Sequence, residues 1–170
     1  MIIRRRAAVV FAALLVALDR FTKYLVETSL TLYEPVPVLP FLTWYRTWNE
    51  GIAFSFLTFL DDRILAGLVA IIILYVMWLW RRTSRWRWLS QIGFAFVIGG
   101  AIGNLFDRLF LGYVVDFILV HAGNWSFAIF NLADAFITVG AIAIVLDEFI
   151  VSRNLPRSGR PVSPSNSPEE

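Results

Sequence analysis

The sequence predicts a mainly α-helical, polytopic membrane protein with four transmembrane helices, a small outward-facing β-sheet and a short interfacial helix. Of its 170 residues, 58% are hydrophobic and only 16% are charged, whereas soluble domains have about 45–50% apolar and about 25% charged residues. Four apolar stretches are long enough to cross about 30 Å of hydrocarbon, which takes roughly 17–25 helical residues. These stretches cover about 7–26, 64–80, 89–106 and 127–146.

The first span is predicted to be a retained helix. It follows Arg4–Arg6, as the apolar segment of a secretory signal peptide would. However, Asp19, Arg20 and Lys23 stand where a cleavage site of small residues would be expected. The segment is therefore counted as the first transmembrane helix.

The distribution of basic residues predicts the orientation. Ten of the fifteen Lys and Arg residues lie on one side of the four-helix topology. The positive-inside rule makes this side cytoplasmic, with both termini inside, so that 27–63 and 107–126 face outward. The ten residues are Arg4, Arg5, Arg6, Arg81, Arg82, Arg85, Arg87, Arg153, Arg157 and Arg160.

The outer segment 27–63 is predicted to form a cap over the bundle. Its three prolines break helices and favour extended backbone. The aromatic and β-branched run Phe41–Trp48 is typical of a strand or hairpin. The apolar run Ala53–Leu60 is expected to lie as a short helix in the membrane interface.

We expect one membrane-embedded domain over 1–155. The remainder, 156–170, is rich in Pro, Ser and Arg and is predicted to be a disordered cytoplasmic tail.

Composition excludes several kinds of site. The chain has no cysteine and a single histidine, His121. Disulfides, Fe–S clusters, a cysteine nucleophile and a multi-histidine metal site are therefore excluded. The sequence also lacks the G-x-S-x-G, H-E-x-x-H and P-loop motifs, as well as a basic groove for nucleic acid. We expect no metal, no cofactor and no nucleic-acid partner.

Polar residues cluster at the outward ends of helices one, three and four, although charged groups at membrane depth cost about 2.5–3.5 kcal/mol each. Asp19 and Lys23 are four residues apart and share a helical face. They could form a salt bridge that lowers the cost of both charges, or they could bind substrate directly. The pattern alone leaves both possibilities open.

A second set of polar residues lies at the end of helix three. Asn104, Asp107 and Arg108 share one helical face, and we expect Asn104 and Arg108 to organise an acidic site. The glycines that precede them, at 99, 100 and 103, are expected to allow close helix packing.

Two aspartates lie in outward-side segments joined by a short link. Asp116 follows helix three in an extended-looking stretch, and Asp134 is expected about two turns into helix four, on one face with Asn131. Two carboxylates brought together can share a proton, so that one acts as a base and the other as an acid. The residues fit such a catalytic dyad or an ion-coupling site. His121, in the link, is expected to be a surface residue, and Asp147 and Glu148 at the inner end are expected to be structural.

Two other classes of protein fit part of this pattern. An ion-coupled transporter would use intramembrane carboxylates, but such folds usually contain internal repeats, and none is visible here. A non-catalytic anchor subunit would use polar residues for packing, but it explains neither the outer segment nor the two aspartate motifs.

Five runs resemble, in order, the motifs of bacterial lipoprotein signal peptidase (signal peptidase II). The resemblance covers the chain from the first span to the fourth. Any one run is weakly specific, whereas five in order on four spans are highly specific. The runs are Asp19–Lys23, Asn49–Phe54, Gly99–Arg108, Val114–Phe117 and Phe130–Asp134.

The resemblance implies a metal-independent aspartic endopeptidase of the bacterial inner membrane, with its active site near the periplasmic face. It implies that the substrates are prolipoproteins carrying a diacylglyceryl group, cleaved just before the lipidated cysteine. It also implies a fold with an outer β-cradle and an interfacial helix. The expected partners are these substrates and membrane phospholipid, and we expect a monomer.

The resemblance assigns the site residues as well. Asp116 and Asp134 would form the catalytic pair. Two positions depart from the family pattern, Arg20 for a common glutamine and Ile52 for the usual alanine, and neither belongs to the pair. Residues expected to line or support the site are Asp19, Lys23, Asn49, Gly51, Asn104, Arg108 and Asn131.

Overall fold

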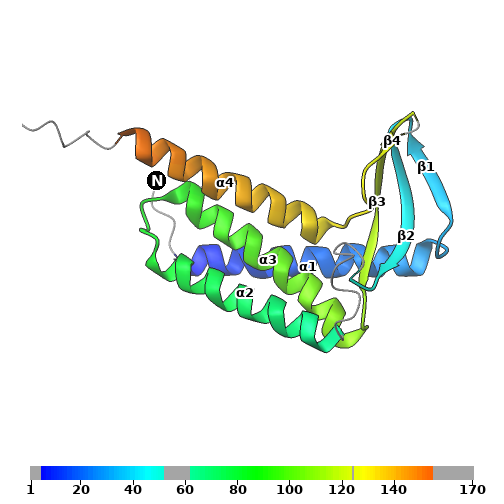
Figure 1. The fold of residues 1–170 in the computed structure, drawn as a ribbon, viewed down its shortest axis with the longest axis horizontal. Helices are drawn as coiled ribbons and strands as arrows, with labels where there is room; N and C mark the ends of the chain where they lie inside the picture. The colour runs from blue at the N-terminus through cyan, green and yellow to red at the C-terminus, as the bar shows by residue number, and fades with distance from the viewer. Residues whose placement is uncertain (1–4, 52–61, 124, 155–170) are drawn as a thin grey trace, which may run out of the picture.

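The computed structural model describes residues 5–51, 62–123 and 125–154. Within them, four helices run alternately up and down in a bundle, and a small sheet lies across one end (Figure 1). The helices are α1 (Arg5–Ser29), α2 (Asp62–Arg82), α3 (Trp88–Phe110) and α4 (Leu132–Asn154). The strands are β1 (Pro35–Leu39), β2 (Leu42–Asn49), β3 (Val114–Ala122) and β4 (Trp125–Ser126).

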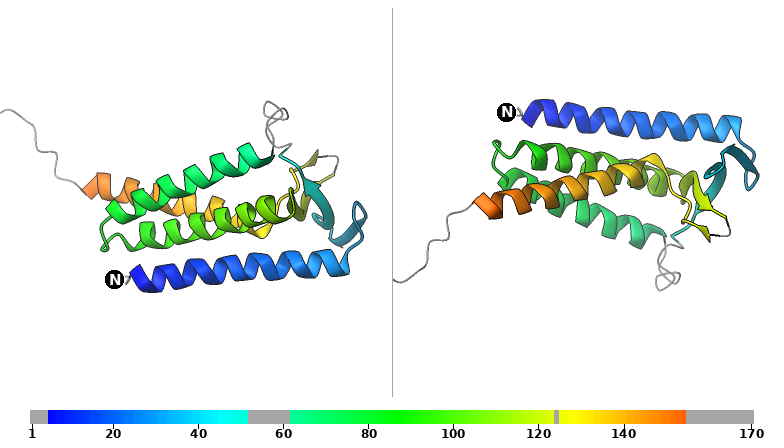
Figure 2. Two further views of the ribbon diagram at one scale, coloured as in Figure 1. Left: turned by 90° about the horizontal axis from the view of Figure 1, so that it is seen from below. Right: turned by 90° about the horizontal axis from the view of Figure 1, so that it is seen from above.

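The central helix of the bundle is α3. It packs against α1, α2 and α4, and these three make fewer contacts with one another (Figure 2). It also contributes more buried residues than any other helix, from Ser90 at the end away from the sheet, here called the inner end, to Asp107 at the sheet end, here called the outer end. Polar groups on α3 are therefore placed between neighbouring helices, where they must find partners in the protein.

The glycines of α3 allow this close packing, as the sequence predicted. A Cβ atom at Gly100 would lie 2.3 Å from the backbone oxygen of Ala133 in α4. At Gly103 it would lie 2.5 Å from Oδ2 of Asp19 in α1. These positions bring α1 and α4 to van der Waals distance from the outer half of α3.

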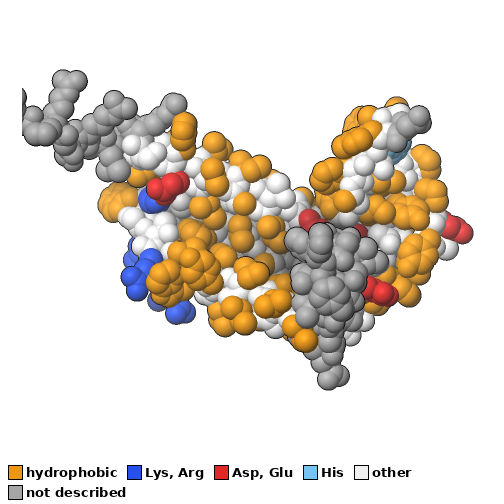
Figure 3. Space-filling model, in the orientation of Figure 1, with side chains coloured by type: hydrophobic (Ala, Val, Ile, Leu, Met, Phe, Trp, Pro, Cys, Tyr) orange, Lys and Arg blue, Asp and Glu red, His pale blue; other side chains and the backbone are white. Residues whose placement is uncertain are grey.

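The other helices present apolar side chains to their surroundings. Val10, Ile71 and Val145, on three different helices, are each more than half exposed, and hydrophobic side chains cover much of the bundle in Figure 3. Such a surface is suited to lipid. By length and hydropathy, three helices of the described residues could cross a membrane: Ile64–Arg82, Trp88–Phe110 and Leu132–Ser152.

Helix α1 is not among these three candidate spans. At 25 residues it is as long as the others, and it lies along α3 through the full bundle (Figure 2). It differs from them by carrying Asp19, Arg20 and Lys23 within its apolar length.

The four strands form an antiparallel sheet in the order β1-β2-β3-β4. The predicted strand over 41–48 is confirmed as β2, and β1 pairs with it through a tight turn at Pro40-Phe41. Strand β3 joins β2 in a register that places Asp116 opposite Thr47, just past an irregularity in the pairing. The sheet thus carries Asp116 to the end of the bundle where α1, α3 and α4 meet it (Figure 1).

The predicted start of the fourth helix, at 127, was wrong. Residues 127–130 are extended, and Phe130 forms a bridge to Ile118 of β3. The helix begins only at Leu132 and continues to Asn154. Asp134 therefore lies in the first turn of α4 rather than two turns into it.

A separate polar cluster, the inner cluster, holds the opposite end of the bundle. Asp147 of α4 accepts hydrogen bonds from Arg87 Nε at 2.6 Å and Ser90 Oγ at 2.5 Å. Arg87 also pairs with Glu148 at 2.8 Å. Asp147 and Glu148 are structural, as expected from the sequence, and basic side chains gather at this end in Figure 3.

The expected interfacial helix at 53–60 and the expected tail at 156–170 lie outside the described residues.

Candidate active site

Asp116 is buried between the sheet and the bundle. Only 2% of the residue is exposed, because β3 is covered by β2 on one side and by the helices below it. Its two carboxylate oxygens accept hydrogen bonds from amide side chains, Oδ2 from Asn49 at 2.8 Å and Oδ1 from Asn131 at 2.7 Å. The carboxylate is therefore oriented by two neutral donors.

Asp134 is held by a reciprocal cap at the start of α4. Asn131 precedes the helix, and its Oδ1 accepts the Asp134 backbone N–H at 3.0 Å. In return, Oδ2 of Asp134 accepts the Asn131 backbone N–H at 3.2 Å. This is the geometry of a capping box with Asn and Asp in place of the usual Ser and Glu.

Asn131 joins the two aspartates. Its Oδ1 is used in the cap and its Nδ2 donates to Asp116, so one side chain contacts both segments. Asn104 completes the link from α3: its Nδ2 donates to Asp134 Oδ1 at 2.7 Å, and its Oδ1 accepts from Asn131 Nδ2 at 3.1 Å. The structure thus brings Asp116 and Asp134 into one hydrogen-bonded network, although they lie on β3 and α4.

Lys23 fixes the orientation of this network. Its Nζ donates to Oδ1 of Asn104 at 2.9 Å, which leaves the Asn104 amide nitrogen to face Asp134. Lys23 is fully buried, and it pairs with Asp19 at 2.9 Å. The predicted Asp19–Lys23 salt bridge therefore forms, and the burial of both residues favours an internal role over direct contact with substrate.

A further buried acid, Asp107, balances the charge of Lys23. Its Oδ2 lies 2.7 Å from Lys23 Nζ, and its Oδ1 pairs with Arg20. Arg20 also lies over the ring of Phe106, 4.5 Å from its centroid. The unusual arginine at position 20 is thus explained as a second cation for a site with two acids.

Asp107 was not among the predicted site residues. Its spacing of three from Asn104 was the available signal, because it places both on the face that α3 turns towards α1. The sequence does not reveal that α1 presents Lys23 to that face.

Asn49 is positioned by a turn. Its Oδ1 accepts the backbone N–H of Gly51 at 3.0 Å, so its amide nitrogen faces Asp116. Gly51 has φ +90°, a conformation that L side chains rarely adopt. Gly51 therefore belongs to the site through its backbone.

Arg108 lies at the rim of the network. Its guanidinium donates to the backbone oxygen of Asn104 at 3.4 Å, and the side chain is partly exposed. It therefore contacts the residue that donates a hydrogen bond to Asp134.

His121 lies away from this network. It forms a hydrogen bond of 3.0 Å with Thr43 within the sheet. Ile52, the second unusual residue, lies outside the described residues. Within 5–51, 62–123 and 125–154, no group of three or more His, Asp or Glu residues is placed to hold a metal ion.

The surroundings of Asp116 favour its protonated form. Burial raises the pKa of the carboxyl from its ordinary value of 3.8 to about 6, and the hydrogen bond from Asn49 opposes this shift. The negative charge of Asp134 also contributes to the rise to about 6. A carboxyl group whose pKa is raised in this way, beside a second carboxylate, can act as one half of an acid–base pair.

The surface beside the site offers room for an apolar ligand. A pocket of about 370 Å³ lies between the outer end of α1 and the sheet, with Trp44 and Phe117 in its wall. Phe117 directly follows Asp116. Figure 3 also shows a notch between the bundle and the sheet, with acidic side chains at its base.

Comparison with known proteins gives one consistent result. The family described as signal peptidase (SPase) II matches residues 11–150. A lipoprotein signal peptidase of Sinorhizobium fredii is 51% identical over 142 residues, which cover 82% of this chain and 86% of that protein. The lipoprotein signal peptidase of Allorhizobium ampelinum is 48% identical over 146 residues, covering 86% of this chain and 90% of that protein.

Two solved structures share the fold. A bacterial membrane enzyme determined by the in meso method at 2.3 Å resolution superposes with a TM-score of 0.78 at 26% identity, covering 90% of this chain and 94% of that one. A second, at 1.9 Å resolution, gives a TM-score of 0.74 at 28% identity, covering 82% and 90%.

Proposed function

The chain belongs to the signal peptidase II family, and we propose that it removes signal peptides from prolipoproteins by an aspartic mechanism. The proposed substrates carry a diacylglyceryl group, and the peptide bond cut is the one just before the lipidated cysteine. The observation that carries the mechanism is the contact of Asn131 with both Asp116 and Asp134. It joins two acids from separate elements in one amide network.

In the proposed reaction the pair shares one proton. The ionised carboxylate takes a proton from a water molecule, and the water oxygen attacks the carbonyl carbon of the substrate. The protonated carboxyl gives its proton to the carbonyl oxygen, which yields a tetrahedral diol. The diol then collapses: one diol hydroxyl gives its proton to the ionised carboxylate, the C–N bond breaks, and the amine nitrogen receives a proton from the protonated carboxyl. The pair again holds one proton, and a new carboxyl end remains on the signal peptide.

The supporting residues hold this pair without neutralising it. The amide donors come from Asn49, Asn104 and Asn131. The backbone N–H of Gly51 orients the Asn49 side chain. Lys23 orients the Asn104 side chain by a hydrogen bond, and its positive charge is paired with Asp19 and Asp107. Arg108, partly exposed at the rim, is proposed to contact the substrate backbone.

We also propose the membrane arrangement. All four helices span the inner membrane, with α1 tolerated because Asp19 and Lys23 are buried against α3. Both termini are cytoplasmic, and the sheet forms a periplasmic cradle for the peptide. The pocket beside Phe117 accepts an apolar part of the substrate. The protein works as a monomer, with one domain over 1–155 and a cytoplasmic tail over 156–170.

The test is cleavage of a diacylglyceryl-modified prolipoprotein by the purified full chain in lipid. Asp116→Asn and Asp134→Asn are each expected to lower kcat/KM by about 10³-fold, because each removes one half of the acid–base pair. Glu27→Gln is the matched control. It removes a carboxylate near the outer end of α1, outside the network. Normal cleavage by either aspartate variant would contradict the dyad, and no cleavage by the unaltered protein would contradict the function.

A further inference from the structure

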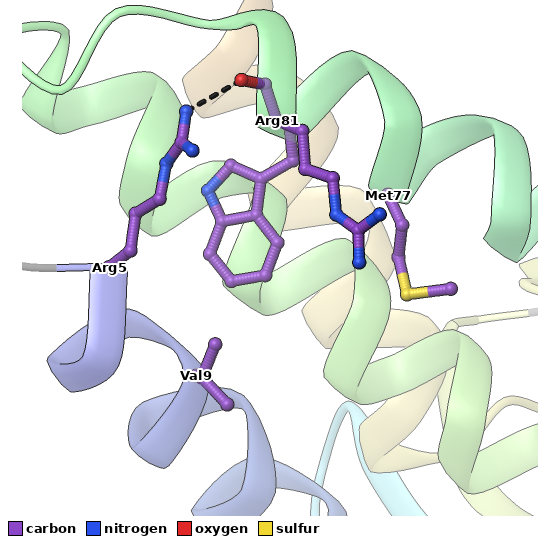
Figure 4. A pocket seen from close by; sticks show the side chains of 5 residues that line it. Arg5, Val9, Met77 and Arg81 are labelled. Carbon is purple, nitrogen blue, oxygen red and sulfur yellow. Dashed lines mark hydrogen bonds between the residues drawn. The ribbon is translucent and has the colours of Figure 1, made fainter.

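A second pocket lies at the opposite end of the bundle from the aspartates. It has a volume of about 220 Å³ and is formed by the start of α1 and the last turns of α2 (Figure 4). Its lining is Arg5, Val9, Met77, Trp80 and Arg81. The helices are joined here by a hydrogen bond of 2.6 Å from Arg5 Nη2 to the backbone oxygen of Arg81.

The two arginines retain donors that the described residues do not use. Nε of Arg5 is buried and has no hydrogen-bond partner there. The guanidinium of Arg81 is exposed beside the pocket (Figure 4), and only the backbone oxygen of Arg81 is engaged by Arg5. Two positive groups with free N–H donors therefore border one hollow.

The rest of the lining is apolar. Trp80 uses its only donor on Gln91, at 2.7 Å, and so presents its ring to the pocket. Val9 and Met77 are hydrocarbon and thioether surfaces. The pocket therefore combines cationic donors with a wall suited to an alkyl chain, and a free inorganic phosphate would use only the first of these.

The position of the pocket indicates where such a ligand comes from. It opens between two helices whose outer faces are strongly apolar, as at Ile72 and Leu74 of α2. Exposed Trp78 and Trp88 mark the membrane interface at this end. Basic pockets between transmembrane helices on the cytoplasmic side are suited to anionic lipid head groups.

We propose that this pocket binds one anionic phospholipid, with its phosphate on Arg5 and Arg81 and an acyl chain along Val9 and Met77. A zwitterionic lipid is disfavoured, because its cationic amine would face a second arginine. The inference depends on the membrane setting of the bundle and not on the aspartic mechanism.

Native mass spectrometry of the full chain tests the proposal, with phosphatidylglycerol and phosphatidylcholine as the two probes. The unaltered protein is expected to retain one phosphatidylglycerol in preference to phosphatidylcholine. Arg81→Ala should weaken that binding by about fivefold, the effect of one basic residue near an anionic head group. Equal retention of the two lipids would overturn the proposal.

Two further variants separate a built site from general positive charge. Arg85→Ala removes one positive charge from the segment that follows α2, outside the pocket, and it should change binding less than twofold. Met77→Trp keeps every charge and fills the pocket, and it should displace the lipid. If Arg85→Ala weakens binding as much as Arg81→Ala, or if Met77→Trp binds normally, the pocket is not the site.

Discussion

The two ends of the bundle hold carboxylates in opposite ways. At the inner end, Asp147 is neutralised by the guanidinium of Arg87 and accepts a hydrogen bond from the Ser90 hydroxyl. At the outer end, Asp116 and Asp134 receive their hydrogen bonds from amides, and neither forms an ion pair with any residue that the structure describes. A guanidinium pair fixes a charge permanently, whereas amides fix an orientation and leave the charge free to change.

At the outer end, Lys23 and Arg20 form their ion pairs with acids other than Asp116 and Asp134. Lys23 and Arg20 pair with Asp19 and Asp107, and Lys23 reaches Asp134 only through the Asn104 amide. The difference between the ends thus separates carboxylates that stabilise the fold from carboxylates that can exchange a proton.

The largest expected effect in this comparison comes from Asn131. Asn131→Ala removes the donor to Asp116 and the cap of α4 together, and we expect a loss of about 100-fold in kcat/KM, as misplacement of a catalytic group by about 1 Å can cause. The measurement is prolipoprotein cleavage by purified protein in lipid.

Asn131→Asp distinguishes capping from positioning. Aspartate keeps an oxygen for the helix cap but replaces the donor to Asp116 with a second acceptor. Its unfolding temperature should match that of the unaltered protein while activity is lost. Full activity in this variant would mean that the amide donor is not needed.

A smaller effect, of the opposite kind, is expected at the inner end. Asp147→Asn removes the charge that pairs with Arg87, and we expect unfolding to become easier by about 1–2 kcal/mol, reduced from the value for a fully buried pair because Arg87 is partly exposed. Thermal unfolding in detergent measures this. Cleavage per folded molecule should remain within about twofold of that of the unaltered protein. A large loss of kcat/KM would contradict the view that Asp147 serves only the stability of the fold.

The smallest expected effect is a shift in pH dependence. The Asn49 hydrogen bond lowers the pKa of Asp116 against the effect of burial, which brings it to about 6. Asn49→Ala should therefore move the alkaline limb of kcat/KM, where Asp116 loses its proton, to higher pH. A limb that stays in place or moves to lower pH would show that Asp116 is not the proton donor.

The same pKa has a consequence for stability. Because the folded pKa of Asp116 exceeds its ordinary value of 3.8, the folded state holds this proton more tightly. The stability that this proton contributes is fully present below about pH 3.8 and is lost as the pH rises through about 6. Asp116→Asn should not show this loss.

Hydropathy predicted the helices well, because long apolar runs have few other solutions. The exception was the start of α4. Phe127 and Phe130 look like the first residues of a membrane helix, but they are held in an extended path by pairing with β3. The local signal for the true start was Asn131 followed three residues later by Asp134, a pattern of residue identity that hydropathy does not register.

The sequence indicated the individual residues of the candidate site better than the contacts between them. The polar residues stood out because each is costly in lipid. Their partners did not, because contact between Lys23 on α1 and Asn104 on α3 depends on how the helices are rotated. Asp107 was missed for the same reason.

Asn131 makes the formation of α4 and the assembly of the aspartate pair a single event. Its side chain cannot cap the first turn of α4 until that turn exists, and only then is its amide nitrogen turned towards Asp116. During synthesis α4 is the last of the described helices to emerge. Under the proposed mechanism, a chain in which only α1, α2 and α3 have formed would therefore be an inactive precursor, and activity would arise only when α4 folds.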